Sequence, residues 1–175
     1  GIEIRHGAEV NILDREGRLD MDDYLLKQMD VVIASLHTPC MQKDAGKAGN
    51  TRAVIKAMEN SYVNILGHPD DSRFPLDYEA VVRSAKEQGV LLELNNNSLH
   101  PLGARQDPLP NDIEMLEYCK KYGAPIILGS DAHTQEDVGN HTFVRILLEE
   151  LDFPEELIVN RSVAEYQKYI NRKCV

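Results

Sequence analysis

Histidine and carboxylate side chains recur at the places where the apolar runs of this sequence end. Glu9, His37, His68 and the pair Asp131 and His133 each close or follow such a run. If the runs are parallel strands, these side chains meet, because ligands gather beyond the carboxyl ends of such strands. Imidazole nitrogens together with carboxylate oxygens are the ligand set of zinc, manganese and iron sites. The sequence therefore predicts a site for a divalent transition metal ion.

The residues around these side chains indicate pre-organised ligands. Asp131 and His133 are separated by one residue, a spacing that places both side chains on the same face of an extended segment. A proline closely follows both His37 and His68, which stiffens the turn after each strand and fixes the direction of the imidazole. Taken alone, a His-Pro pair is also typical of an ordinary loop start.

Glu9, His37 and His68 lie on successive repeats and could bind one ion from adjacent strand ends. Three protein ligands leave a coordination position for water, which is the arrangement of a catalytic metal site. Water activated by a metal has a pKa near ~7 and acts as a nucleophile at neutral pH, while a neighbouring ion holds the substrate oxygens. Asp131 is placed to bridge toward such an ion or to accept a proton.

The elements that must position these residues alternate between two kinds. Short apolar runs predict strands that are buried on both faces, at residues 30–36, 63–67, 90–95, 125–129 and 157–160. Apolar residues at helical spacing predict helices at 50–60, 77–88 and 111–121. The helix signals are starts at Asn50, Asn111 and Ser162 and glycine ends at Gly89 and Gly123.

This alternation predicts an α/β fold of parallel strands joined by right-handed crossovers. The strand ends recur about 30 residues apart, which is the length of one βα unit. The chain therefore holds roughly six units, fewer than the eight of a complete (β/α)₈ barrel. We find no linker and no second domain in the sequence.

Composition limits the classes of function. The 175 residues are 42% hydrophobic and 27% charged, as in a globular protein, and the net charge is −10. That charge argues against nucleic-acid and membrane partners, and no apolar stretch reaches the roughly 20 residues that span a bilayer. Three cysteines at no metal-like spacing predict a reduced, cytoplasmic protein: Cys40, Cys119 and Cys174.

Five motifs, taken in order, resemble the PHP (polymerase and histidinol phosphatase) superfamily, and in particular its small stand-alone phosphatases. They are Gly7-Ala8-Glu9-Val10-Asn11, Ser35-Leu36-His37-Thr38-Pro39, Gly67-His68-Pro69, Leu92-Glu93-Leu94-Asn95-Asn96-Asn97 and Gly129-Ser130-Asp131-Ala132-His133. The resemblance implies a distorted seven-stranded TIM-like barrel, up to three metal ions and phosphoesterase activity. It implies that Glu9 bridges two ions, that His37 and His68 bind one of them, and that Asp131 and His133 bind the others.

The family's amino-terminal strands, which supply a His-x-His motif, have no counterpart before Gly1. We therefore expect residues 1–175 to form a single PHP-like domain, a carboxyl-terminal fragment of a longer chain. The barrel would be incomplete, with its first strands missing, and at least one metal site would be retained.

Further residues are candidates for substrate binding. Arg105 lies in the loop after the 90–95 strand and suits a phosphate group, although a solvated loop charge is the alternative. Asn97 could bind substrate or satisfy the backbone of a turn. Asp131 and His133 are the catalytic candidates, whereas His6 is expected on the opposite face and Cys40 lacks a second thiol.

The favoured hypothesis is a metal-dependent phosphoesterase that hydrolyses phosphate monoesters of small molecules by metal-activated water. The alternative is a non-catalytic PHP-like module for assembly or regulation, since the exposed edges of an open barrel favour pairing with a second copy. A polymerase-associated PHP domain fits the net charge of −10 and the short chain least well.

Overall fold

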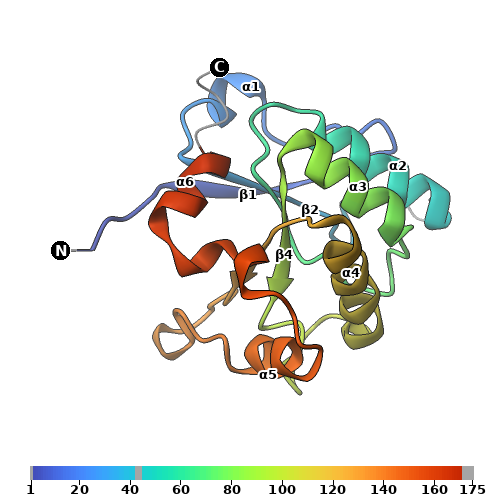
Figure 1. Ribbon diagram of the computed structural model, residues 1–175. Coiled ribbons are helices and arrows are strands. Elements are labelled where there is room, and N and C mark those ends of the chain that lie inside the picture. The colour runs from blue at the N-terminus through green and yellow to red at the C-terminus, as the bar shows by residue number, and fades with distance from the viewer. Residues whose placement is uncertain (1, 42–44, 171–175) are drawn as a thin grey trace.

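The computed structural model describes residues 2–41 and 45–170. Its centre is one sheet of five parallel strands in the order β1-β2-β3-β4-β5 (Figure 1). The strands are β1 (Gly7–Asn11), β2 (Val31–Ser35), β3 (Ile65–Leu66), β4 (Leu91–Asn95) and β5 (Ile126–Gly129). Because each strand pairs with the next one along the chain, all five carboxyl ends lie at one edge of the sheet, as the sequence predicted.

Helices alternate with the strands. They are α1 (Asp23–Leu26), α2 (Gly46–Met58), α3 (Tyr78–Gln88), α4 (Pro108–Tyr122), α5 (Thr142–Glu150) and α6 (Val163–Ile170). Three short 3-10 helices are η1 (Gln135–Asp137), η2 (Glu155–Leu157) and η3 (Val159–Arg161). Helices α2, α3 and α4 lie together on one side of the sheet and α6 lies on the other (Figure 1).

The predicted helix ends are confirmed, but two predicted starts are wrong. Gly89 and Gly123 end α3 and α4 in the left-handed conformation, with φ of 64° and 62°. The Ser162 hydroxyl accepts a hydrogen bond from the Glu165 amide at 3.2 Å, as a capping residue does. Asn50 and Asn111 instead lie inside helices that begin earlier. Their side-chain amides donate to backbone carbonyls of the 67–76 loop.

The main core lies between the sheet and helices α2 to α5. Leu92 and Leu94 of β4 are fully buried there, against Val81 and Val82 of α3 and Met115 of α4. The opposite face of the sheet carries a smaller apolar cluster, which α6 covers: Val31, Ile65, Leu91, Val159 and Ile170. This two-sided burial explains why the strands read as continuous apolar runs.

Two expectations for the fold differ from the structure. The sheet is open, since β5 does not pair with β1 in the described residues, and the predicted barrel is not confirmed. The strand predicted at 157–160 is wrong: residues there form η2 and η3, with only an isolated bridge from Ile158 to Ile126. The side-chain amide of Asn160 occupies the edge of β5 instead, accepting from Leu128 N at 2.7 Å and donating to Leu128 O at 3.0 Å.

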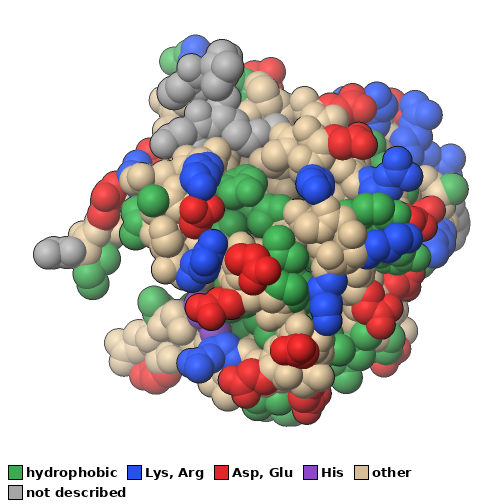
Figure 2. Space-filling model, in the orientation of Figure 1, with side chains coloured by type: hydrophobic (Ala, Val, Ile, Leu, Met, Phe, Trp, Pro, Cys, Tyr) green, Lys and Arg blue, Asp and Glu red, His purple; other side chains and the backbone are tan. Residues whose placement is uncertain are grey.

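The described surface carries both signs of charge. Figure 2 shows acidic and basic side chains interspersed over one face, with hydrophobic side chains gathered near its centre. Within the two described stretches, no helix is both long enough and apolar enough to cross a membrane. Cys40 and Cys119 are free thiols, while Cys174 and Gly1 lie outside the described residues.

Candidate metal centre

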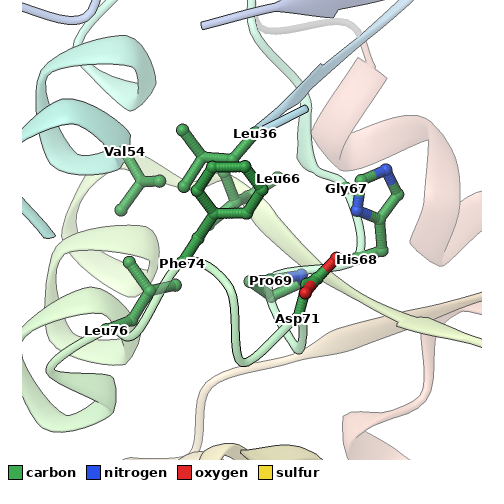
Figure 3. A pocket seen from close by; sticks show the side chains of 9 residues that line it. All are labelled: Leu36, Val54, Leu66, Gly67, His68, Pro69, Asp71, Phe74 and Leu76. Carbon is green, nitrogen blue, oxygen red and sulfur yellow. The ribbon is translucent and has the colours of Figure 1, made fainter. Parts of the chain in front are cut away.

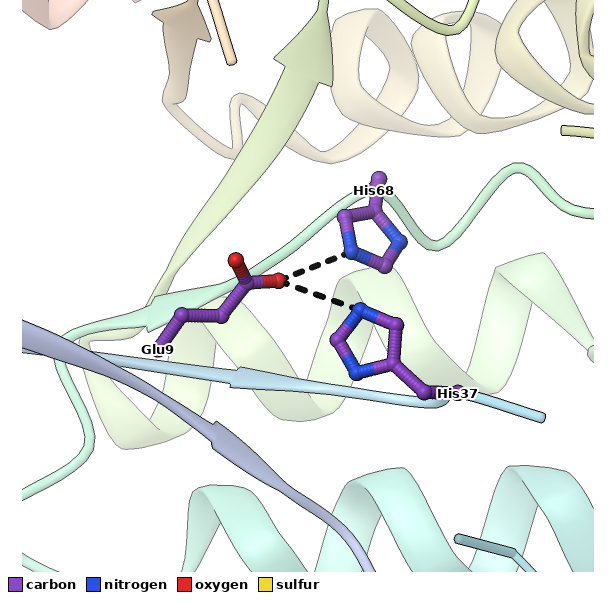
Figure 4. Close-up of side chains that lie close together, drawn as sticks. All are labelled: Glu9, His37 and His68. Carbon is purple, nitrogen blue, oxygen red and sulfur yellow. Dashed lines mark hydrogen bonds and ion pairs between the residues drawn. The ribbon is translucent and has the colours of Figure 1, made fainter. Parts of the chain in front are cut away.

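Glu9, His37 and His68 come together at the carboxyl edge of the sheet. Glu9 is in β1, His37 follows β2 by two residues, and His68 follows β3 by two residues. One ligand atom from each lies within 4.8 Å of the other two (Figure 4). The convergence follows from the topology, because three consecutive parallel strands present their ends side by side.

Both imidazoles address the same carboxylate oxygen. Glu9 Oε1 lies 2.9 Å from Nε2 of His68 and 3.4 Å from Nε2 of His37 (Figure 4). The two rings are tilted by 56°, with centroids 4.9 Å apart. The side chains therefore point at one shared position rather than along the surface.

The electrostatics of the site follow from these contacts. Hydrogen bonds from His37 and then from His68 hold the pKa of the Glu9 carboxyl far below its usual range. Burial opposes a charge on His68, but the hydrogen bond to Glu9 and the nearby Glu93 carboxylate outweigh it, so the pKa of His68 lies above its ordinary value. The Glu9 carboxyl is therefore ionised, and its charge favours a proton on His68.

Two residues that the sequence did not single out hold the histidines: Asn11 contacts the His37 ring, and Glu93 contacts the His68 backbone. Asn11 Oδ1 lies 2.7 Å from Nδ1 of His37, and Asp20 in turn fixes Asn11 through its amide nitrogens. Glu93 Oε2 accepts a hydrogen bond from the His68 amide at 2.8 Å. A ring partner such as Asn11 fixes a metal-binding histidine and leaves its other nitrogen for the ion.

Glu93 is a buried carboxylate inside the sheet, between two glycines. A Cβ atom at Gly129 would lie 1.9 Å from Glu93 Oε1, and one at Gly67 would lie 3.5 Å from Oε2. Burial raises the pKa of Glu93, while the charge of His68 opposes that rise. The sequence signal was present: an acidic residue interrupts the apolar run 90–94, and glycines occupy the neighbouring strand ends.

The donor set fits a divalent transition metal ion. Two imidazole nitrogens and one carboxylate oxygen are typical ligands of zinc, manganese or iron. Asn11 occupies Nδ1 of His37, so Nε2 is the atom that this ring presents to the shared position. Three ligands also leave coordination positions free, in contrast to a closed structural site.

Asp131 and His133 lie directly after β5 and do not belong to this three-residue group. His133 Nδ1 lies 2.8 Å from the Asp131 carbonyl and 3.9 Å from its carboxylate, and the His133 side chain is 73% exposed. Asp131 has φ of 47° and His68 has φ of 28°, a conformation that is costly for residues other than glycine. Asp107 and Asp152, which are not predicted site residues, share this conformation. The assignment of Asp131 and His133 as catalytic groups or metal ligands stays a prediction.

Arg105 lies beside Asp131, with its terminal nitrogen 3.9 Å from the Asp131 carboxylate. Its Nε atom is buried and has no hydrogen-bond partner among the described residues. The charge of Arg105 also acts to lower the pKa of His68, against the larger rise that Glu9 and Glu93 cause. Arg105 therefore contacts Asp131 and interacts electrostatically with His68.

The neighbouring asparagines differ in their roles. Asn97 is half-buried, and its carbonyl accepts a hydrogen bond from the His100 amide, so its side chain remains a candidate for substrate binding. Asn95 is buried and structural, since it donates to Glu93 at 3.3 Å and accepts from the Ser98 amide at 3.0 Å.

His6 is exposed, and its backbone amide donates to Asp30.

Relatives of known sequence match nearly the whole chain. The sequence profile of a family described as PHP-associated matches residues 114–157. A protein of Clostridium novyi (strain NT) named probable phosphatase is 40% identical over 173 residues, covering 99% of this chain and 70% of the relative. Another of that name, from Acetivibrio thermocellus, is 43% identical with the same coverage. A third, from Caldanaerobacter subterraneus subsp. tengcongensis, is 40% identical and is covered to 67% of its length.

A solved structure shares the fold. A chain in the cryo-EM structure of archaeal ribonuclease P with mature tRNA superposes with a TM-score of 0.64 and 17% identity. The match covers 99% of this chain and 71% of that chain. At this identity the likeness concerns the arrangement of strands and helices alone.

Proposed function

Because this chain belongs to the phosphatases of the PHP superfamily, we propose that it hydrolyses phosphate monoesters with a divalent transition metal ion held by Glu9, His37 and His68. The observation that carries the proposal is the convergence of three ligand atoms within 4.8 Å of one another. When bound, such an ion lowers the pKa of water and neutralises phosphoryl oxygens. Zinc, manganese and iron all suit these ligands.

The residues after β5 complete the catalytic group in this proposal. Asp131 and His133 serve as further ligands and as proton carriers. Nδ1 of His133 contacts the Asp131 carbonyl, which leaves Nε2 to bind a metal ion or to carry a proton. The high exposure of His133 gives it access to substrate from solvent.

Arg105 and Asn97 bind the substrate in this proposal. The guanidinium of Arg105 has a buried nitrogen without a partner in the described part of the chain, and a phosphate oxygen would supply one. We expect Arg105→Ala to raise the KM for a phosphate monoester roughly 10-fold or more, with a smaller change in kcat, because a charge-assisted hydrogen bond is lost. Steady-state kinetics measure this, and an unchanged KM would contradict the role of Arg105.

A phosphatase assay tests the proposed activity. The protein is incubated with p-nitrophenyl phosphate and zinc, manganese or iron, and turnover is compared between wild type and His37→Ala. The matched control is His6→Ala, because His6 is exposed and its hydrogen bonds to Asp30 are made by its backbone amide and carbonyl. We expect turnover that His37→Ala abolishes and His6→Ala retains. No turnover with any of these metals, or equal turnover in His37→Ala, would contradict the proposal.

We also propose that the open sheet is part of a TIM-like barrel. The face that α6 covers in part holds a cavity of about 400 Å³ whose lining includes Glu9, Ile33, Glu93 and Ile127. Glu9 and the Glu93 carboxylate would then face the barrel interior. The competing function is a non-catalytic assembly module. The open sheet also favours it, because exposed sheet edges can pair with a second copy of the chain. Sedimentation that shows a dimer, together with no turnover, would support the module.

A further inference from the structure

A cavity of about 620 Å³ lies between the 98–107 loop and helices α4 and α5. The apolar side chains in its lining include Leu99, Pro101, Leu109, Phe143, Ile146 and Leu147. Small-molecule sites have volumes of about 300–1,000 Å³ and walls that are mainly apolar, with a few polar groups. The cavity therefore has the size and the surface of a small-molecule site.

The cavity lies beyond the carboxyl edge of the sheet, where the candidate metal centre also lies. Asn96 directly follows β4, and its side-chain oxygen accepts from the amides of Phe143 and Val144 at 2.8 and 3.3 Å. These bonds fasten the first turn of α5 to the end of β4, and Figure 1 shows β4 pointing toward α5. The His100 ring meets the Phe143 ring edge-on, with centroids 5.4 Å apart. The loop and α5 are therefore adjoining walls at the strand ends.

The 98–107 loop is held by the 67–76 loop. The Ser72 amide donates to the Gln106 carbonyl at 2.9 Å, and the Arg73 guanidinium donates to the Ala104 carbonyl at 3.1 Å. The two bonds fix the backbone immediately before and after Arg105. The position of the Arg105 side chain is thus set from both sides.

The 67–76 loop is itself fixed to the core. Phe74 is 8% exposed and lies beside Leu36 and Val54 (Figure 3). The Asp71 carboxylate accepts from Nε of Arg73 at 2.9 and 3.0 Å, which orients the guanidinium that bonds the 98–107 loop. The cavity wall therefore rests on packed side chains of the core.

Arg105 connects the cavity with the predicted site residues. It lines the cavity, and its terminal nitrogen lies 3.9 Å from the Asp131 carboxylate. The Arg105 side chain is 18% exposed, and its buried Nε atom has no hydrogen-bond partner among the described residues. In the proposed function this guanidinium binds phosphoryl oxygens. An ester whose phosphate is bound by Arg105 therefore has the apolar cavity beside it.

We propose that this cavity binds the leaving group of the substrate, so that the protein prefers phosphate monoesters of apolar alcohols. The inference deepens the proposed function and rests on it. Hydrolysis joins the oxygen of water to phosphorus, breaks the bond from phosphorus to the ester oxygen, and moves a water proton to that oxygen, which leaves as the alcohol. The apolar part of this alcohol lies in the cavity, while Arg105 holds the phosphate end.

The charges around the cavity favour an uncharged leaving group. Asp107 and Glu150 are exposed members of the lining, and Arg105 is the one Lys or Arg among the lining residues that the structure describes. With Arg105 on the phosphate, the two carboxylates would repel a second anionic group of the substrate. Apolar walls also disfavour a leaving group with many hydroxyls, because each hydroxyl would lose its water without gaining a partner.

Hydrolysis of two esters tests the proposal. The leaving alcohols of 2-phenylethyl phosphate and ethyl phosphate have similar acidity, so a difference in kcat/KM reports binding of the phenyl group. In metal-loaded wild type, we expect kcat/KM to be roughly 10- to 100-fold higher for the 2-phenylethyl ester, the usual effect of burying an aromatic ring. Phosphate release measures both rates.

Variants of the cavity wall assign this preference to the cavity. Ile146→Asn and Leu109→Asn change side chains that are 49% and 47% exposed, on two different helices, and introduce no charge. We expect each variant to lower the ratio of the two kcat/KM values to about threefold or less. The matched control is Val163→Asn in α6, because Val163 is 71% exposed and α6 lies on the other face of the sheet. This control should keep the wild-type ratio.

The outcomes separate this inference from the proposed function. Equal kcat/KM values for the two esters in wild type, or a ratio that both cavity variants retain or that Val163→Asn also loses, would overturn the inference and leave the phosphatase intact. Equal values together with a dimer that the cavity variants dissociate would assign the cavity to a second copy of the chain. Wild type that hydrolyses neither ester would contradict the proposed function. Calorimetry then decides the inference: tighter binding of the 2-phenylethyl ester that Ile146→Asn abolishes would support it, and equal affinities would overturn it.

Discussion

At the scale of single residues, the direction of the His37 imidazole depends on a neighbour outside the three-residue group. Asn11 lies 2.7 Å from Nδ1 of His37 and is itself held by Asp20. Because the asparagine oxygen accepts from Nδ1, a bound metal ion would use Nε2. That nitrogen lies 3.4 Å from Glu9. Asn11 therefore selects the tautomer of His37 that can bind a metal ion.

Replacing Asn11 tests this role. We expect Asn11→Ala to lower zinc affinity about 10-fold, because His37 loses the group that fixes its ring. Asn11→Asp retains an acceptor oxygen but places a second carboxylate against Asp20, so it should restore the affinity only in part. Competition with a zinc-binding dye measures both values. An Asn11→Ala protein with unchanged affinity would show that His37 is oriented by other contacts.

The sequence could predict the three-residue group but not the residues that orient it. Glu9, His37 and His68 were predictable because parallel topology brings successive strand ends together, whatever the detailed packing. The partnership of Asn11 with His37 depends on two side-chain conformations across a strand pair, which residue spacing does not determine. Glu93 was predictable in part, since a carboxylate within a buried strand requires a polar partner.

At the scale of elements, Glu93 sits in β4 where both neighbouring strand ends carry glycine. The close approach of Gly129 to the Glu93 carboxylate leaves no room for a larger residue. The carboxylate is thereby directed along the sheet to the His68 amide, 2.8 Å away. The two glycines thus make room for the carboxylate that holds the His68 backbone.

Gly129→Ala should displace this carboxylate. We expect a loss of about 1–3 kcal/mol in the free energy of unfolding, the usual cost of overpacking a core. A double-mutant cycle with Glu93→Ala supplies the control, because removing the carboxylate makes space for the new methyl group. Urea unfolding measures the four proteins. If Gly129→Ala costs as much in the Glu93→Ala background, the clash is not with Glu93.

Element type was more predictable than element boundaries. Helices α3 and α4 end at the predicted glycines because a left-handed residue is required there, a local property. The start of α4 at Pro108 was missed because Asn111 resembles a capping residue while it bonds the 67–76 loop instead. The strand predicted at 157–160 was wrong for a similar reason: the Asn160 side chain takes the place of backbone pairing with β5.

At the scale of the whole molecule, buried acidic groups link folding to pH. Burial raises the pKa of Asp112 well above its ordinary value, and the charges of Asp70 and Glu93 add to the effect. The folded state therefore holds a proton that the unfolded chain releases above about pH 4. The stabilisation from this proton is complete below that pH and is lost as pH rises through the folded-state pKa.

Asp112→Asn should remove this dependence. The free energy of unfolding of wild type is expected to fall from pH 4.5 toward pH 7.5 more steeply than that of Asp112→Asn, which has no proton to lose. Urea unfolding at several pH values measures the slopes. Asp152→Asn is the control, because Asp152 is exposed. Parallel slopes in wild type and Asp112→Asn would contradict the account of this buried acid.

The metal content of the purified protein tests the central claim most directly. Protein prepared without chelator is analysed for zinc, manganese and iron by mass spectrometry, alongside His68→Ala and the exposed-histidine control His6→Ala. We predict at least one ion per chain in wild type and in His6→Ala. We predict one ion fewer in His68→Ala, whose circular dichroism should remain that of a folded α/β protein. Folded wild-type protein that contains no metal and takes up none on titration would contradict the claim.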